Sequence, residues 1–475
     1  MRTEFDKIMD TCSGAFKQSR TAERVLQLAY GLLTCYGRHT VTGMLTACGQ
    51  QFVDWTSAYK IFSEGRINMD KIFDVSSWSV LEELTPDQML VAHMDDTIIK
   101  KTGKKIPGTA WRRDPLGPPF HTNFIWGQRF LQISMALPDA QRNCQSRAIP
   151  VDFHHCPTVK KPKKTAETDE LVVFKEQQRI AKLSKQGSLR IHALRERLNQ
   201  QGAAHRQLFI SVDGSYTNET VLKTLPDKVT LIGRIRKDTT LYALPNKAQS
   251  TGRKKVYGKQ LPSPEQIRQS EDIPWQFLQA WAAGKSHNFK VKVIKDVRWR
   301  SAGQQHTLQL VVISPLGYRL KKDSRILYRQ AAYLICTDSK LEIEKLLQAY
   351  LWRWEIEVNF RDEKTILGCG QAQVRNPESA KNLPAFTTAI YAFMLLAAHR
   401  ANKNRNESMF PKAKWDSVNE HQRMTSSEMI NLLRGQLWMS NDKMSFSGFL
   451  KNEHLNKSQK NYSNPIAAAL FYVRK

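Results

Sequence analysis

Residues 207–217 read QLFISVDGSYT, an apolar run that ends in an acid and a glycine. Residues 89–97, MLVAHMDDT, have the same character and end in two acids. Short apolar runs bounded by such residues are typical of buried β-strands. In an open sheet, residues at the carboxyl ends of neighbouring parallel strands meet at one edge, where such sheets build their sites. The two runs therefore predict a sheet with acidic side chains gathered at its edge.

Working outward from these runs, the pattern predicts an α/β protein. Further strands are expected at 124–137, 148–153, 229–236 and 331–338, and helices at 169–202, 341–367 and 385–399. The last of these, AFTTAIYAFMLLAAH, is too short to span a bilayer and fits a buried core helix.

Charge is the strongest signal in the composition. The 475 residues include 72 Lys and Arg against 44 Asp and Glu, a formal net charge of +28 spread over the whole chain. Such a surface favours a polyanionic partner, because Lys and Arg contacts to phosphates release condensed counterions. No apolar run reaches 18 residues, and neither a secretory leader nor a basic amphipathic terminal helix is seen. We expect a cytoplasmic protein that binds nucleic acid, with no membrane association.

The seven cysteines are scattered and form no C-x-x-C pair, so neither disulfides nor a structural zinc site is expected. His154, His155 and Cys156 are possible ligands in a row. Neighbouring side chains of an extended chain point to opposite faces, which disfavours one shared metal ion there.

Changes in pattern divide the chain into five parts. Residues 1–85 carry helical periodicity and predict an all-helical N-terminal domain. The sheet-forming core is expected in two parts, 86–240 and 329–400. A basic, β-rich insertion at 241–328 separates them, and 401–475 is expected to be a helical C-terminal region for DNA binding or dimerisation.

Three acids stand where this order of elements would bring them together: Asp96, Asp213 and a glutamate on the helix at 341–367. Convergent carboxylates repel one another without a cation, and their oxygens suit Mg²⁺ or Mn²⁺. One or two such ions can clamp the attacking and leaving oxygens of a phosphodiester displacement. Asp95 competes with Asp96 for the first position, since alternation along a strand sends one of the two inward.

The late helix carries the sharpest pattern, AYLWRWEIEVNFRDEKTILG at 349–368. At about 100° per residue, Tyr350, Arg353, Glu357 and Lys364 fall within a sector of roughly 60° on one face. One interpretation is a metal-binding carboxylate framed by side chains that contact the DNA backbone. The other is a solvated helix face with ordinary pairing of residues four apart.

Other titratable residues near these motifs are expected to have ordinary roles. Glu355, Asp362 and Glu363 lie off the shared face, so we expect surface acids. His93 is an odd number of residues from Asp96, which predicts core packing on the opposite side of the strand.

The helix spacing resembles the Tyr-Arg-Glu-Lys signature of bacterial insertion-sequence DDE transposases, with Tyr350, Arg353, Glu357 and Lys364 at the four fixed positions. Asp96-Thr97 and Val212-Asp213-Gly214 resemble the first and second acid motifs of that family. The Asp-Thr match favours Asp96 over Asp95. The resemblance covers about residues 85–400.

This resemblance implies a ribonuclease-H-like mixed sheet flanked by helices, interrupted by the β-rich insertion and preceded by N-terminal helices that bind element ends. It implies a cut-and-paste enzyme that cleaves at terminal inverted repeats and joins the ends to target DNA. Asp96, Asp213 and Glu357 would hold two Mg²⁺ ions, which Mn²⁺ can replace. The implied partners are double-stranded DNA and at least one second copy of the chain, in the nucleoid of a bacterium.

The resemblance also suggests residues that contact DNA: Tyr350, Arg353 and Lys364 on the helix, and Lys100 and Lys101 in a basic loop. Trp299, between Arg298 and Arg300, is the candidate to stack a flipped base if the enzyme forms a hairpin end. Its alternative role is to fill the core of the insertion.

Two other functions stay open. A catalytically silent, transposase-derived regulator would bind DNA without metal-dependent cleavage, and a structure-selective nuclease would cut DNA without joining ends.

Overall fold

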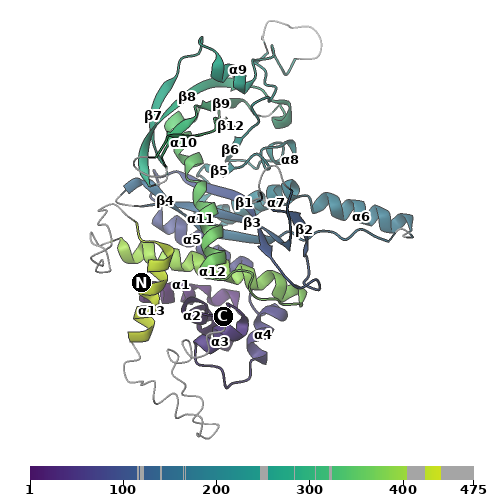
Figure 1. Cartoon of the computed structure of the whole chain (residues 1–475), viewed down its shortest axis with the longest axis vertical. Coiled ribbons are helices and arrows are strands. Elements are labelled where there is room, and N and C mark those ends of the chain that lie inside the picture. The colour runs from purple at the N-terminus through teal and green to yellow at the C-terminus, as the bar shows by residue number, and fades with distance from the viewer. Residues whose placement is uncertain are drawn as a thin grey trace.

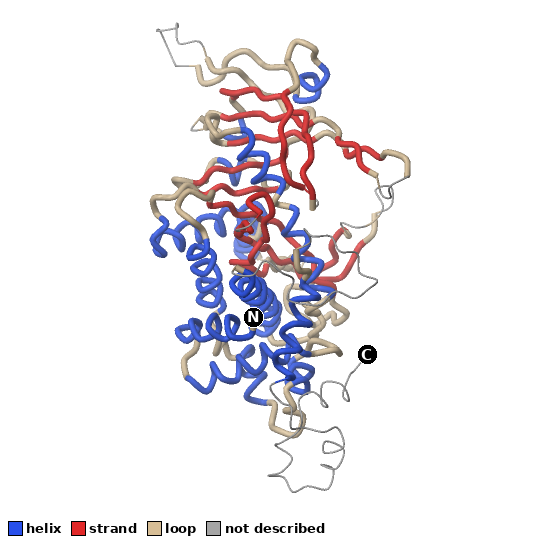
Figure 2. The backbone as a smooth tube through the Cα atoms, turned by 90° about the vertical axis from the view of Figure 1, so that its left-hand side faces the viewer, coloured by secondary structure: helices blue, strands red, loops and turns tan. Residues whose placement is uncertain are grey.

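The computed structural model describes residues 1–114, 117, 122–139, 142–163, 165, 167–245, 255–282, 284–304, 306–319, 324–403 and 423–439. These residues form a mixed α/β protein in which helices flank one large sheet (Figure 1). In Figure 2, most helices lie in the lower half of the molecule and most strands in the upper half.

The bounds of the elements are as follows. The α-helices are α1 (Arg2–Thr11), α2 (Ser19–Thr34), α3 (Val41–Ala47), α4 (Thr56–Ser63), α5 (Met69–Glu83), α6 (Thr168–Ile180), α7 (Leu183–Leu198), α8 (Glu219–Leu222), α9 (Pro264–Gln269), α10 (Ile343–Leu351), α11 (Trp354–Thr365), α12 (Pro377–Asn402) and α13 (Ser426–Met439). The strands are β1 (Leu90–Lys100), β2 (Ala110–Arg113), β3 (Phe124–Asp139), β4 (Arg142–His155), β5 (Leu208–Val212), β6 (Val229–Arg234), β7 (Gln276–Ala282), β8 (Lys285–Val297), β9 (Leu308–Ile313), β10 (Leu316–Tyr318), β11 (Leu327–Arg329) and β12 (Ala332–Cys336).

The main sheet has ten strands in the order β2-β3-β1-β5-β6-β12-β9-β8-β7, with β4 also paired to β3. At its centre, β1, β5 and β6 run parallel, and the other pairs are antiparallel. The pairing of β1 with β5 confirms the prediction that the runs at 89–97 and 207–217 are neighbours.

The strands expected in the insertion extend this same sheet. β9 pairs with β12, and β8 and β7 follow, so the sheet continues from the core into residues 276–313. β10 and β11 form a separate two-stranded sheet. The N-terminal helices also share a core with the sheet, because their buried side chains belong to the same hydrophobic cluster.

Helix α12 joins these parts. It packs against α1, α4 and α5 and also against β4, and residues 382–398 are all buried, which confirms the buried core helix predicted at 385–399. Pro384 interrupts the hydrogen bonding of α12, because a proline lacks the N–H that would bond to the carbonyl four residues earlier. The Gln128 side chain of β3 donates to that carbonyl, on Ala380, at 3.2 Å.

Two helices predicted as continuous are broken. The stretch at 169–202 forms α6 and α7, and α6, none of whose residues is buried, projects from the body of the molecule (Figure 1). The stretch at 341–367 forms α10 and α11, separated by a turn at Trp352 and Arg353.

Most of the predicted C-terminal region at 401–475 lies outside the described residues, which include the end of α12 and residues 423–439. Six cysteines are free thiols, and the side chain of Cys144 also lies outside the described part. None of the helices in the described part of the chain is long and apolar enough to cross a bilayer.

We predict that Gln128→Leu destabilises the fold by about 1–3 kcal/mol, because it removes the side-chain donor to the carbonyls of Ala380 and Pro107. Urea unfolding measures the change. Gln177→Leu, at an exposed position of α6, is the matched control and should stay within about 0.5 kcal/mol of the wild type. Equal effects of the two substitutions would contradict this account.

Candidate active site

The parallel pairing of β1 with β5 sets the positions of two acids. Met94 lies opposite Val212 at the end of the register. Asp95 and Asp213 are the next residues on the two chains, so the same register brings them side by side at the sheet edge. Consistent with this, the nearby charge of Asp213 adds to burial in raising the pKa of Asp95.

Helices α10 and α11 cover the face of the sheet to which these two acids point. Side chains two residues apart on a strand share a face, so Ser211 of β5 lies on the face of Asp213. The Ser211 hydroxyl donates to the carbonyl of Ala349 in α10 at 3.0 Å. Further along the same face, Asn359 of α11 donates to Ala148 of β4 at 2.8 Å.

Asp96 points to the opposite face. Its carboxylate accepts a hydrogen bond from the Tyr216 hydroxyl at 2.8 Å and forms an ion pair with Arg129 at 3.3 Å. Helix α7 covers this side, since a Cβ at Gly187 would lie 3.0 Å from the Tyr216 ring and 3.1 Å from Met94. Asp96 and Glu357 therefore lie on different sides of the sheet, and Asp95 takes the place next to Glu357 that was expected for Asp96.

Arg353 connects the strand to the late helix. It stands in the turn between α10 and α11, and its guanidinium forms ion pairs with Asp95 at 3.0 Å and with Glu357 at 3.3 Å. The ring of Tyr350 lies 5.9 Å from the guanidinium carbon. The structure thus brings Tyr350, Arg353 and Glu357 together although the helix that was expected to carry them is broken.

Burial and crowding of like charges disfavour ionisation at this site. Burial, with Asp213 close by, raises the pKa of Asp95 to about 7, although Arg353 opposes the rise. Burial also raises the pKa of Glu357, again against the effect of Arg353. The pKa of Asp96 is raised mainly by burial and is opposed by Arg129.

These carboxylates are chemically suited to a hard divalent cation, since all their donors are oxygens and their mutual repulsion favours a positive charge between them. Arg353 supplies one such charge. Among the residues that the structure describes, no three His, Cys, Asp or Glu side chains are close enough to share a metal ion.

The lysines that were expected to contact DNA have different environments. Lys364, in the last turn of α11, is half-buried, and burial lowers its pKa, with Lys100 adding to the effect. Lys100 is exposed at the end of β1. The Lys101 ammonium is instead buried and donates to the carbonyls of Gly370 and Ala372 at 2.9 and 2.8 Å, so it is committed to holding that loop.

Trp299 and its two arginines have internal contacts. Trp299 is partly buried and packs against the main hydrophobic cluster. Arg298 donates to the carbonyl of His306 at 2.9 Å, and the guanidinium of Arg300 lies 5.2 Å from the ring centre of Tyr242. These contacts are those expected of a residue that fills the core, the alternative role considered for Trp299.

The prediction that Asp362 and Glu363 are surface acids is wrong, because both are buried. Asp362 accepts hydrogen bonds from Ser426 at 2.7 Å and Tyr391 at 3.3 Å. The Gln132 amide of β3, turned so that its nitrogen faces Glu363, donates to both carboxyl oxygens. The position of these residues around the helix did not predict their burial, because α12 and β3 enclose α11 on several sides.

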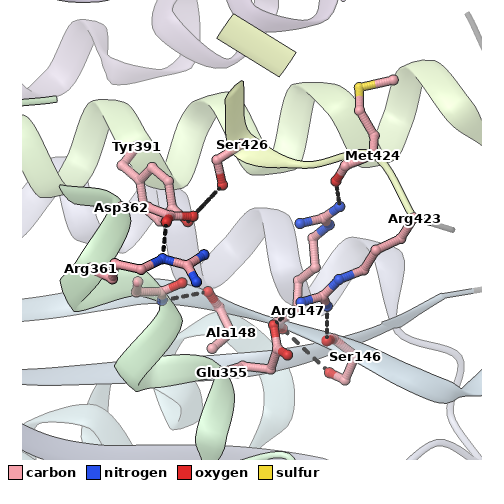
Figure 3. A network of polar contacts seen from close by, with 11 residues as sticks. Ser146, Arg147, Ala148, Glu355, Arg361, Asp362, Tyr391, Arg423, Met424 and Ser426 are labelled. Carbon is pink, nitrogen blue, oxygen red and sulfur yellow. Dashed lines mark hydrogen bonds and ion pairs between the residues drawn. The ribbon is translucent and has the colours of Figure 1, made fainter. Parts of the chain in front are cut away.

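A polar network holds the outer side of α11 (Figure 3). Arg423 forms an ion pair with Glu355 at 2.5 Å and donates to the carbonyl of Ser146 in β4 at 2.7 Å. Arg147 donates to the carbonyl of Met424. The segment before α13 thus ties α11 to β4, and it fixes the helix that carries Glu357. Sequence reasoning gave no signal for these contacts, which join residues far apart in the chain.

The prediction that His93 packs in the core is confirmed, since it is fully buried and burial lowers its pKa to about 3. Tyr216 and Arg129, the partners of Asp96, were missed. Tyr216 lies three residues after Asp213, within the run QLFISVDGSYT. This closeness to a predicted site residue was the signal that could have identified it.

We predict that Glu363 makes the stability of the protein fall as pH rises. Burial raises its pKa from the ordinary 4.5 to about 8 in the folded chain. Between these values the unfolded chain loses the proton that the folded chain keeps, so the free energy of unfolding decreases over this range and levels off above it. Glu363→Gln should flatten the dependence in urea unfolding at pH 5, 7 and 9.

Glu344→Gln, at an exposed position of α10, provides the control and should keep the wild-type dependence. An unchanged pH dependence in Glu363→Gln would show that this carboxyl is ionised in the folded protein.

Comparison with known families adds an independent finding. A family model described as "DDE superfamily endonuclease" matches residues 12–306. That range includes Asp95, Asp96 and Asp213, whereas the helix with Glu357 follows it. No curated protein matches the sequence.

Proposed function

The chain belongs to the DDE superfamily of endonucleases, and we propose that it is the transposase of an insertion element. In this proposal it cuts DNA at the terminal inverted repeats of its element and joins the freed ends to target DNA. The superfamily acts on DNA and generally uses divalent metal ions, which agrees with the net charge of +28.

One observation carries the proposal. Arg353 forms ion pairs with Asp95 of β1 and Glu357 of α11, beside Asp213 at the end of β5. Burial and Asp213 raise the pKa of both Asp95 and Glu357, and Arg353 opposes both shifts, so the three acids lie near one another although their side chains do not converge on one point. Perturbed pKa values of this kind cluster at functional sites, which supports the proposal.

We propose Asp95, Asp213 and Glu357 as the metal-binding carboxylates. Asp96, the first candidate from sequence, remains the alternative to Asp95 and has the second role of holding Tyr216 and Arg129. Two Mg²⁺ ions, when bound, would supply the activation of water and then of the 3′-hydroxyl. Arg353 and Lys364 would hold phosphates, and Tyr350 would contact the strand end.

The proposed partners are double-stranded DNA of the element ends and the target, and a second copy of the chain. Two copies are needed because both ends must be cut together. The experiment for the overall function uses labelled DNA from both flanks of the gene, incubated with Mg²⁺ and either the wild type or Asp213→Asn.

Paired cleavage and strand-transfer products with the wild type alone would support a transposase. Cleavage without joined products would indicate the nuclease alternative. Binding without cleavage by either protein would indicate the regulator.

We predict different effects for the two neighbouring aspartates. Asp95→Asn should lower metal-dependent cleavage by about 100-fold or more, because it removes a proposed metal ligand. Asp96→Asn should have a much smaller effect, because an amide oxygen can still accept from Tyr216. Cleavage rates on the same labelled DNA measure both effects. A greater loss of cleavage in Asp96→Asn than in Asp95→Asn would identify Asp96 as the metal ligand on β1.

A further inference from the structure

Two large aromatic side chains stand in solvent at the edge of the sheet. Trp111 of β2 is 65% exposed and Phe124 of β3 is 56% exposed. Trp111 lies opposite Trp126 of β3, and their rings meet edge to face with centroids 5.5 Å apart. The Trp126 indole N–H donates to the carbonyl of Gly103 at 3.3 Å. Trp111 is therefore supported from one side by a fixed ring, and its other surface is open.

This aromatic surface lies on the same face of the sheet as the proposed active site. Asp95 lies opposite Gln132 of β3, and Trp126 and Phe124 are an even number of residues from Gln132. Residues an even number apart on a strand share a face. Trp111 shares the face of its partner Trp126.

Cations surround the aromatic surface. Residues 100–114 contain six Lys and Arg and one acid, Asp114. Four of the six are exposed, namely Lys100, Lys104, Lys105 and Arg113. Lys364 of α11 is close enough to Lys100 for that charge to lower its pKa, after the larger effect of burial. Lys364 thus places a further cation near the end of β1.

The acids and the aromatic surface lie toward opposite ends of β1. The amide of Lys101 bonds to the carbonyl of Trp126 at 3.0 Å, which fixes where β1 meets the aromatic residues. Six residues of strand separate Asp95 from Lys101, which is about 20 Å. The loop that Lys101 holds covers this stretch of β1, so a DNA strand of about six or more stacked nucleotides would reach the aromatic surface around that loop.

We propose that Trp111 and Phe124 form a stacking platform for unpaired bases of a DNA strand that leaves the carboxylate site. The proposal rests on the proposed function, and it adds a binding site to it. Open aromatic rings beside a basic path are the combination by which proteins hold single-stranded DNA, since the cations track the phosphates and the rings stack on the bases. Bases inside a duplex hide their faces, so the platform selects unpaired DNA over blunt duplex.

The experiment measures binding of the full chain, without metal, to a fluorescent 12-nucleotide oligothymidylate and to a blunt 20-base-pair duplex. Trp111→Ala should weaken binding of the oligothymidylate about tenfold, and Trp111→Phe should recover most of the loss because it keeps a ring. Duplex binding should change less than twofold. Phe277→Ala on β7, where the side chain is 66% exposed, is the matched control and should bind both probes like the wild type.

Thermal unfolding and sedimentation of each variant accompany the binding data. Unchanged oligothymidylate binding in Trp111→Ala would overturn the platform, and so would an equal loss on the duplex or in Phe277→Ala. A change from dimer to monomer with intact DNA binding would overturn it as well and assign the aromatic surface to a second copy. None of these results depends on cleavage, so metal-dependent cleavage by the wild type would leave the proposed function standing.

Discussion

The pair of contacts made by Arg353 is the interaction on which the rest of the site depends. Its guanidinium holds Asp95 of the sheet and Glu357 of α11 at the same time. Arg353 stands in the turn between α10 and α11, where backbone hydrogen bonds join residues three apart instead of four. Each acid would otherwise be a buried charge facing others of the same sign, so the arginine lets the acids gather before any metal binds.

Successive side chains of β1 point to opposite faces of the sheet, and this alternation decides which aspartate belongs to the proposed site. Asp95 and Asp96 are adjacent, and the strand sends them to opposite faces. One face is covered by α10 and α11, and the other by α7 with Tyr216. The register with β5 then selects Asp95 as the neighbour of Asp213. The outer side of α11 is held by Glu355 and Asp362, so Glu357 is positioned by contacts on both sides of its helix.

Local patterns in the sequence were sufficient for the central strands and the buried helix at 385–399, because burial and period are local properties. The choice between Asp95 and Asp96 needed the register of a second strand, which no local pattern carries. The burial of Asp362 and Glu363 arises from contacts with β3 and α12, and the ion pair of Arg353 with Asp95 joins residues far apart in the chain. The strands of the expected insertion join the main sheet through the pairing of β9 with β12, and no local pattern in the sequence carries that pairing.

The central claim is that Asp95, Asp213 and Glu357 form one cation-binding site. Binding of Mn²⁺, followed by electron paramagnetic resonance at pH 8 in the wild type, Asp95→Asn and Asp96→Asn, tests it most directly, since Asp95 is then ionised. We expect Asp95→Asn to weaken Mn²⁺ binding about tenfold or more and Asp96→Asn to bind nearly as the wild type does. Wild-type binding in Asp95→Asn, with loss in Asp96→Asn, would contradict the account.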